Sequence, residues 1–141
     1  MKKFELTTES ITFLGRTLFR IKALISFGNV KAGELGGYIE KEGNLSHEGN
    51  AWVCGDARVC GDARVCGNAD IATISGFGSE YRTTTFFRTK NDEIAVKCGC
   101  FYGTLAEFRE KVKETHGDNR YAKEYLMIAD LMEMHFRGEE E

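Results

Sequence analysis

The sequence predicts a mainly β protein in which short strands wind into a parallel coil, with antiparallel strands before the coil and a hairpin and two helices after it. Three observations support this prediction. A six-residue unit repeats in the middle of the chain, β-branched and aromatic segments precede it, and two helical patterns follow it. We expect three parts: capping strands in residues 1–36, the coil in residues 37–78, and an oligomerisation or binding module in residues 79–141.

The repeat begins at residue 37 and reads GYIEKE, GNLSHE, GNAWVC, GDARVC, GDARVC, GNADIA. Its third and fifth columns hold mostly small or apolar residues that alternate with polar ones, and Gly followed by Asn or Asp opens most units. The alternation is the strand period, and the Gly pairs are typical of turns. Strands this short make poor hairpins, but they can form a coil whose turns pair in parallel. We therefore expect the alanine and valine columns to point inward, with Lys41 and His47 interrupting the valine column at one end.

This pattern resembles the left-handed parallel β-helix of hexapeptide-repeat proteins, in which three hexads make one triangular turn. The stretches FGNVKAGELGGYIE, CGCFYGTLAEF and VKETHGDNRYAKEY also resemble short hexapeptide-repeat proteins of phages and prophages. The resemblance implies a short left-handed β-helix capped by N-terminal antiparallel strands and followed by a β-hairpin and two helices. It also implies a homo-oligomer, either a trimer or a dimer-based assembly.

The segments before and after the repeat have sequence patterns typical of antiparallel strands and turns. Residues 2–35 favour two or three antiparallel strands, with turns at TTES and GR. After the repeat, TTTFFR and EIAVKC read as the two strands of a hairpin whose turn is KND. We expect the charged residues of this hairpin to lie at its tip.

Two helices are predicted at the C-terminal end. Thr104 and Glu107 form a capping box for the first helix, and Gly117 closes it. The second helix is expected from about Asp118 to about Phe136. Its apolar residues spread over more than one face, so we expect another subunit to bury the second face.

The five cysteines are expected to be reduced thiols with structural roles. Cys54, Cys60 and Cys66 recur every six residues and would fall on different sides of the coil, so neither a disulfide nor a zinc site is expected within one turn. Cys98 and Cys100 would share one face of a strand. Together with His116 they supply only three metal ligands, so whether these three residues form any site stays open.

Composition excludes several functional classes. The net charge of −3 gives no reason to expect a binder of duplex nucleic acid. No apolar run reaches the ~20 residues of a membrane span, and MKKFELTTES lacks the apolar core of a signal peptide, so we expect a cytoplasmic protein. Phosphate-loop, nucleophile-elbow and paired-carboxylate motifs are missing. We expect no catalytic residues, no metal and no cofactor.

The leading functional hypothesis is a non-enzymatic, oligomeric binding protein of the phage type. It would sequester an anionic nucleotide signal, such as a cyclic nucleotide, and so antagonise a host defence system. One alternative is an antagonist that binds a host protein directly, and another is an acyltransferase that uses acetyl coenzyme A. The candidate ligand-binding residues are cations and aromatics of the repeat and the C-terminal module: Arg58, Arg64, Phe87, Arg88, Lys90, Tyr102, Arg109 and Arg120.

Overall fold

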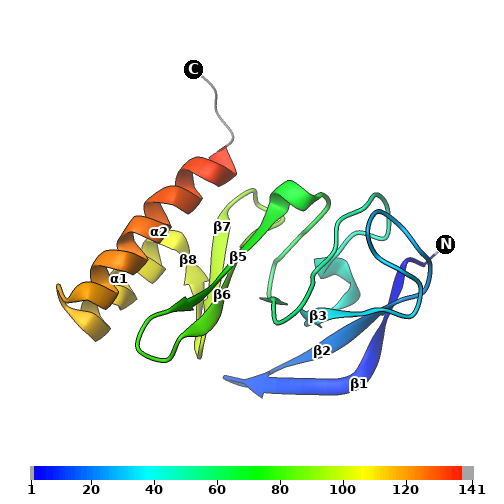
Figure 1. Ribbon diagram of the computed structural model, residues 1–141, viewed down its shortest axis with the longest axis horizontal. Coiled ribbons are helices and arrows are strands. Elements are labelled where there is room, and N and C mark those ends of the chain that lie inside the picture. The colour runs from blue at the N-terminus through cyan, green and yellow to red at the C-terminus, as the bar shows by residue number, and fades with distance from the viewer. Residues whose placement is uncertain (1, 138–141) are drawn as a thin grey trace.

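The computed structural model describes residues 2–137 and is built in three layers (Figure 1). The first layer is a four-stranded sheet together with most of the repeat, and the second is another four-stranded sheet in the middle of the molecule. A pair of helices forms the third layer and covers the far side of the second sheet. The class is therefore mixed α/β, with two small sheets that are mostly antiparallel.

The first sheet has the order β1-β2-β3-β4. Its strands are β1 (Phe4–Phe13), β2 (Arg16–Ala23), β3 (Leu35–Ile39) and β4 (Arg58–Val59). The predicted antiparallel strands are confirmed, and the turn between β1 and β2 has positive φ at Leu14 and Gly15 (47° and 79°). TTES is not a turn, because it lies within β1 at a register shift between Leu6 and Ser10.

The predicted left-handed parallel β-helix is wrong, and with it the resemblance to hexapeptide-repeat proteins of the phage type. Parallel pairing of the repeat is limited to β3 with β4 and one bridge between Leu45 and Val65. Tyr38 pairs with Arg58, so partners lie 20 positions apart and not 18. The end of the expected coil forms β5 (Ile71–Phe77), which pairs antiparallel with the strand that follows it. Six of the seven residues of β5 pair along the neighbouring strand, which satisfies more backbone groups than another turn of two-residue strands.

The inward columns are confirmed for the central units of the repeat, although Ala69 in the last unit is exposed. In the units before it, three valines of the fifth column are fully buried, and three alanines of the third column are buried beside them. These residues are Val53, Val59, Val65, Ala51, Ala57 and Ala63. The alternation therefore identified the buried face correctly, although the chain does not continue as a coil.

The buried side-chain amide of Asn44 links two separate segments of the repeat by hydrogen bonds. The Asn44 side chain accepts hydrogen bonds from the backbone N–H groups of Glu40 (3.1 Å) and Lys41 (3.0 Å). Its amide nitrogen donates to the carbonyl oxygens of Gly61 (3.1 Å) and Ala63 (3.1 Å). The side chain is fully buried, and all four of its hydrogen-bonding positions point at partners.

The second sheet has the order β5-β6-β7-β8 and is antiparallel throughout. Its remaining strands are β6 (Arg82–Arg88), β7 (Ile94–Cys98) and β8 (Phe101–Thr104). The predicted hairpin of TTTFFR and EIAVKC is confirmed as β6 and β7. Both faces of this sheet are covered, since Phe87 joins the core of the first layer and Phe86 joins the core beneath the helices.

The helices are α1 (Leu105–His116) and α2 (Arg120–Arg137). The capping box is confirmed: the Glu107 N–H donates to Thr104 Oγ1 (3.1 Å), and the Thr104 N–H donates to Glu107 Oε1 (2.9 Å). Gly117, with φ of 67°, ends α1 as predicted. Neither helix in the described residues 2–137 is long and apolar enough to cross a lipid bilayer.

Apolar side chains lie on two faces of α2. One face contributes Tyr125, Ile128, Met132 and Phe136, among others, to the core beneath the helices. On the other face Met127, Leu131 and Met134 are exposed. The expectation that another subunit covers such a face stays a prediction, as do the boundaries at residues 36 and 78.

Asn44→Ala is expected to lower the free energy of unfolding by at least about 2 kcal/mol, because it leaves buried N–H and C=O groups without partners. Urea unfolding measures the loss, and Asn91→Ala, at an exposed turn residue, is the matched control. Equal stability of the two variants would contradict the role given to the buried amide.

Candidate functional site

An open cavity of about 560 Å³ lies between β1, β4 and the second sheet. Three cationic side chains line it, those of Arg58, Arg82 and Lys97, and Asp56 is the one carboxylate in its lining. The cations come from three strands, β4, β6 and β7, so it is the packing of the two sheets that brings them together. We call this the cation-lined cavity.

Lys97 is buried because of the alternation along β7. Ala95 and Lys97 point toward the first layer, as the burial of Ala95 in the core of that layer shows, and the Lys97 side chain is only 3% exposed. Its ammonium donates to the Gly99 carbonyl oxygen and lies 4.1 Å from the centroid of the Phe13 ring. Burial lowers the pKa of Lys97 from its ordinary value, and the nearby Arg58 guanidinium lowers it further. Among residues 2–137 it forms no salt bridge with a carboxylate.

Arg58 approaches the cavity from β4. Its backbone N–H donates to Thr85 Oγ1 (3.0 Å), and its guanidinium carbon lies 5.8 Å from the Tyr38 ring centroid. The Nε atom is buried and has no hydrogen-bond partner within the described chain. Buried donors are nearly always paired, so an anion that enters here gains a hydrogen bond which the protein itself does not provide.

Arg82, at the start of β6, packs over the turn between β7 and β8. Gly99 in this turn has φ of 58°, and a Cβ atom added there would lie 1.7 Å from Arg82 Nη1. A side chain at this position would therefore push the guanidinium away and strain the backbone. Within residues 2–137 no hydrogen bond or salt bridge is formed by the Arg82 side chain, which leaves its donors for a ligand.

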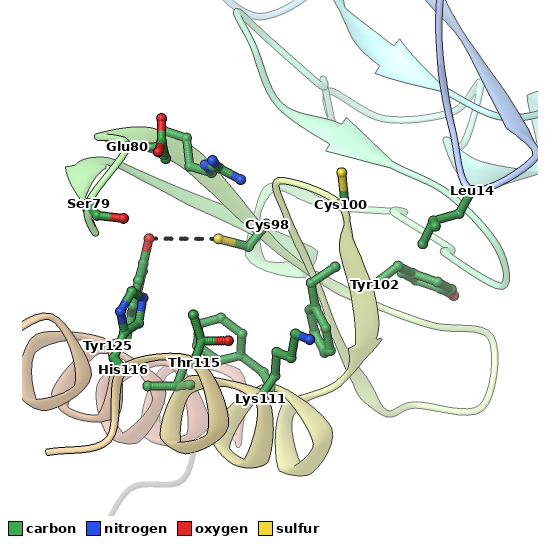
Figure 2. Close-up of a pocket in the computed structure, with 14 residues that line it drawn as sticks. Leu14, Ser79, Glu80, Cys98, Cys100, Tyr102, Lys111, Thr115, His116 and Tyr125 are labelled. Carbon is green, nitrogen blue, oxygen red and sulfur yellow. Dashed lines mark hydrogen bonds between the residues drawn. The ribbon is translucent and has the colours of Figure 1, made fainter.

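A second open cavity, of about 580 Å³, adjoins the first and shares Arg82 and Cys100 with it (Figure 2). Its lining includes Phe101, Phe108 and Val112, and we call it the apolar cavity. At one side of it Thr84 donates to the Cys98 sulfur (3.2 Å), which lies 3.7 Å from the Tyr125 hydroxyl (Figure 2). Burial first, and the neighbouring Cys98 second, raise the pKa of Tyr125 to about 12.

Cys98, Cys100 and His116 all line the apolar cavity without gathering around one point. Figure 2 shows the Cys98 sulfur directed toward Tyr125 and the Cys100 sulfur directed elsewhere. The expectation that both thiols share a strand face is wrong, because β7 ends at Cys98 and the positive φ of Gly99 turns the chain. No group of three or more His, Cys, Asp or Glu side chains in the described residues is placed to hold a metal ion.

The repeat cysteines occupy different environments. Cys60 is fully buried, and burial raises the pKa of its thiol to about 12. Cys54 and Cys66 are exposed, and all five cysteines of the chain are free. A buried thiol with a raised pKa is a poor nucleophile, so Cys60 fits the structural role expected for it.

Of the candidate residues from the sequence, Arg58 alone lines the cation-lined cavity. Phe87 is buried and stacks on Tyr102, with ring centroids 6.3 Å apart. The Tyr102 ring also lies under Arg16, whose guanidinium carbon is 4.9 Å from the ring centroid. Arg64 is exposed.

Three further candidates are engaged in ion pairs. Arg109 contacts Asp130 (2.9 Å) and Glu133 (2.8 Å). The other two make longer pairs, Arg120 with Glu124 (3.7 Å) and Lys90 with Asp62 (3.8 Å). These cations lie on different elements, so they do not converge on one ligand.

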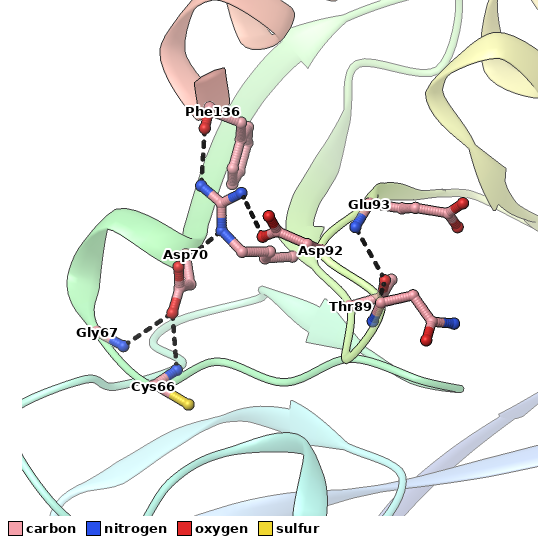
Figure 3. Close-up of polar contacts among 9 residues, drawn as sticks. Cys66, Gly67, Asp70, Thr89, Asp92, Glu93 and Phe136 are labelled. Carbon is pink, nitrogen blue, oxygen red and sulfur yellow. Dashed lines mark hydrogen bonds and ion pairs between the residues drawn. The ribbon is translucent and has the colours of Figure 1, made fainter. Parts of the chain in front are cut away.

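Arg88 holds the end of α2 in place through its contacts with Asp70, Asp92 and Phe136, which are labelled in Figure 3. We call this set of contacts the Arg88 clasp. Its guanidinium contacts Asp70 (2.9 Å) and Asp92 (3.1 Å), and it donates to the carbonyl oxygen of Phe136 (2.8 Å). The same group lies over the Phe136 ring, 5.5 Å from the centroid. With these contacts Arg88 holds β6, the η2 turn (Asn68–Asp70) and α2 together, and its donors face the protein.

Sequence reasoning missed Arg82 and Lys97. Each is an isolated cation in a strand, a pattern that normally marks a solvated position. The one available signal was Lys97 in the run EIAVKC, where strict alternation places Lys97 on the same face as Ala95.

An acyltransferase needs a general base, usually a histidine, so the surroundings of His47 and His116 bear on that alternative. His47 stacks on Phe4 (centroids 4.2 Å apart), accepts from the Lys3 N–H at Nδ1 (3.0 Å), and has Nε2 3.2 Å from Glu42. Both of its ring nitrogens are therefore occupied by structural contacts. His116 stacks against Tyr125, with centroids 6.2 Å apart.

Comparison with known proteins gives no family assignment. No family model, no curated protein and no solved structure matches this chain.

Lys97→Met should change how stability depends on pH. The lowered pKa of Lys97 means that, between that pKa and 10.5, the unfolded chain binds more protons than the folded one, so stability rises with pH in this window. The rise is about 1.4 kcal/mol for each unit of lowering, and the Met variant should lose it. Urea unfolding across the pH range below 10.5 measures both proteins.

The raised pKa of Cys60 acts in the opposite direction above 9.0, because the folded chain keeps a proton that the unfolded chain loses. Because the Lys97 ammonium itself lowers the pKa of Cys60, the Met variant changes this contribution too, so the two curves are compared well below pH 9.0, where the Cys60 thiol is protonated in both the folded and the unfolded chain. A difference that does not vary with pH would contradict the desolvation of Lys97.

Arg88→Met is expected to lower the free energy of unfolding by about 1–3 kcal/mol, since it leaves Asp70 and the Phe136 carbonyl without a charged donor. Hydrogen exchange should show the largest loss of protection in the last turns of α2. Arg64→Met is the control at an exposed arginine, and equal effects of the two substitutions would contradict the clasp.

Proposed function

We propose that this protein binds and sequesters a small phosphorylated molecule in the cation-lined cavity, and that the ligand belongs to the anionic nucleotides. One observation carries the proposal. Arg58, Arg82 and Lys97 converge on a single cavity, and none of them forms a salt bridge within residues 2–137.

The chemistry of these three groups suits a phosphate. Guanidinium groups bind phosphate oxygens through paired N–H donors, and an ammonium adds a compact charge. Partial burial strengthens these contacts, because the local dielectric constant is lower than that of water. Bound phosphate also offsets the repulsion between Lys97 and Arg58, so ligand binding and protonation of Lys97 should reinforce one another.

An aromatic side chain at the same cavity favours a nucleotide over a simple phosphate. The Tyr81 ring lines the cavity and is 64% exposed. Its backbone has φ of 53°, a conformation that a residue with a side chain seldom adopts. Exposed aromatic rings beside cationic groups are a recurring way to hold nucleobases.

Sequestration without turnover fits the groups present. The cavity offers three cations that suit holding a phosphate ester unchanged, and they outnumber the one carboxylate in its lining, that of Asp56, which would repel the phosphate. A cytoplasmic location belongs to the same proposal. Antagonism of a host defence system was inferred from the resemblance to phage proteins, whose fold the structure overturns, so the proposal now rests on the cation-lined cavity. The acyltransferase alternative relied on grooves between β-helical coils, a fold that the structure overturns.

Binding is tested by calorimetry with pyrophosphate, AMP and cyclic AMP, together with thermal shift. Arg58→Gln and Lys97→Met should each weaken binding about tenfold or more, since each removes a charge-assisted contact. Arg64→Gln removes an exposed arginine outside the cavity and should bind as the native protein does. Chromatography after denaturation should return each nucleotide unchanged.

Two results would overturn this function. If none of the three probes binds the native protein, the cavity is not an anion site and direct binding of a host protein becomes the leading hypothesis. If Arg64→Gln weakens binding as much as Lys97→Met, the anions are held by general surface charge. The expected homo-oligomer is tested separately, by light scattering of the purified protein.

A further inference from the structure

The apolar cavity has no part in the function proposed so far, yet it adjoins the cation-lined cavity. Arg82 and Cys100 line both and form the partition between them. Its volume of about 580 Å³ falls within the range of ~300–1,000 Å³ that is usual for small-molecule sites. A ligand that binds Arg82 in the cation-lined cavity can therefore extend a second chemical group into the apolar cavity.

The walls of the apolar cavity are aromatic. The Phe108 ring lies 5.8 Å from the Phe101 ring and 5.5 Å from the Tyr125 ring, measured between centroids. His116 stacks on Tyr125 with an angle of 28° between the ring planes. At these separations the rings contact one another, so they form one continuous aromatic surface, on which a flat group can stack more closely than a branched or extended chain.

Polar side chains also line this cavity. Lys111 and Arg82 add positive charge to it, and Ser79, Glu80 and Thr115 lie among the aromatic residues. They offer two hydroxyls and a carboxylate, which can pair with the ring nitrogens and amino groups at the edge of a nucleobase. A few polar groups around an apolar pocket are the usual means of orienting such a ligand.

We propose that the two cavities form one divided site, in which the phosphate lies on Arg58, Arg82 and Lys97 and the base of the same nucleotide enters the apolar cavity. This inference rests on the proposed anion binding and places the base in the apolar cavity, with the exposed Tyr81 ring of the cation-lined cavity as the competing position that the test distinguishes. It also predicts the ligand class: a phosphate ester that carries a planar heterocycle binds more tightly than the same phosphate on a bare sugar.

The test compares AMP with ribose 5-phosphate by calorimetry. Native protein should bind AMP about 10- to 100-fold more tightly, the gain expected from stacking one base. Thr115→Trp fills the mouth of the apolar cavity from an exposed position on α1, so it should reduce AMP affinity to that of ribose 5-phosphate and leave ribose 5-phosphate unchanged. Glu110→Trp is the control, since Glu110 is exposed on the same helix outside the cavity.

If circular dichroism shows that Thr115→Trp is unfolded, Thr115→Phe, which introduces a smaller side chain into the same cavity, is used in its place. Equal binding of AMP and ribose 5-phosphate by the native protein would overturn the divided site while leaving anion binding intact. So would a loss of AMP preference in Tyr81→Ala but not in Thr115→Trp, because the base would then lie on Tyr81. Failure of the proposed function gives a different result, in which ribose 5-phosphate, AMP and pyrophosphate all fail to bind.

Discussion

The burial of both faces of the second sheet is the constraint on which the rest of the structure depends. Successive residues of a strand point to opposite faces, so β6 needs an apolar side chain on each side, and Phe86 and Phe87 provide them. A sheet of this kind is stable only when something covers each face. The helices cover one and the repeat with the first sheet covers the other, which explains why the N-terminal half packs as a layer and does not continue as a coil.

The same constraint produces the candidate site. On β7 the alternation that buries Ala95 also buries Lys97, and the covering layer adds Arg58 beside it. Lys3 is also buried, and its ammonium donates to the carbonyl oxygens of Ala51 (2.7 Å) and Gly49 (3.4 Å). The Lys97 ammonium likewise donates to a carbonyl oxygen, that of Gly99, but it also lies near the Arg58 guanidinium. A bound anion would offset this repulsion between two cations.

Two cavities on either side of one turn give the site its organisation. The positive φ of Gly99 turns the chain, so the side chains of Cys98 and Cys100 point in different directions. The missing Cβ of Gly99 leaves space for the Arg82 guanidinium. The turn between β7 and β8 therefore determines where Arg82 lies between the two cavities. Positive charge dominates one side, and aromatic surface together with Glu80 and Lys111 lines the other. A ligand with both properties uses the whole site, while a simple anion uses half of it, and this difference provides selectivity without a catalytic group.

Local patterns were enough to predict the capping box at Thr104 and Glu107, the hairpin of β6 and β7, and the buried valines and alanines in the middle of the repeat, because each depends on neighbours close in the chain. Period-two alternation shows which face of a strand is buried but does not show which strand it pairs with. The predicted coil was therefore wrong where β5 pairs with β6. The site follows from packing between distant segments. Arg58 was a candidate from sequence, but Arg82 and Lys97 became part of a site because two separate sheets pack against each other, a long-range contact that no local pattern encodes.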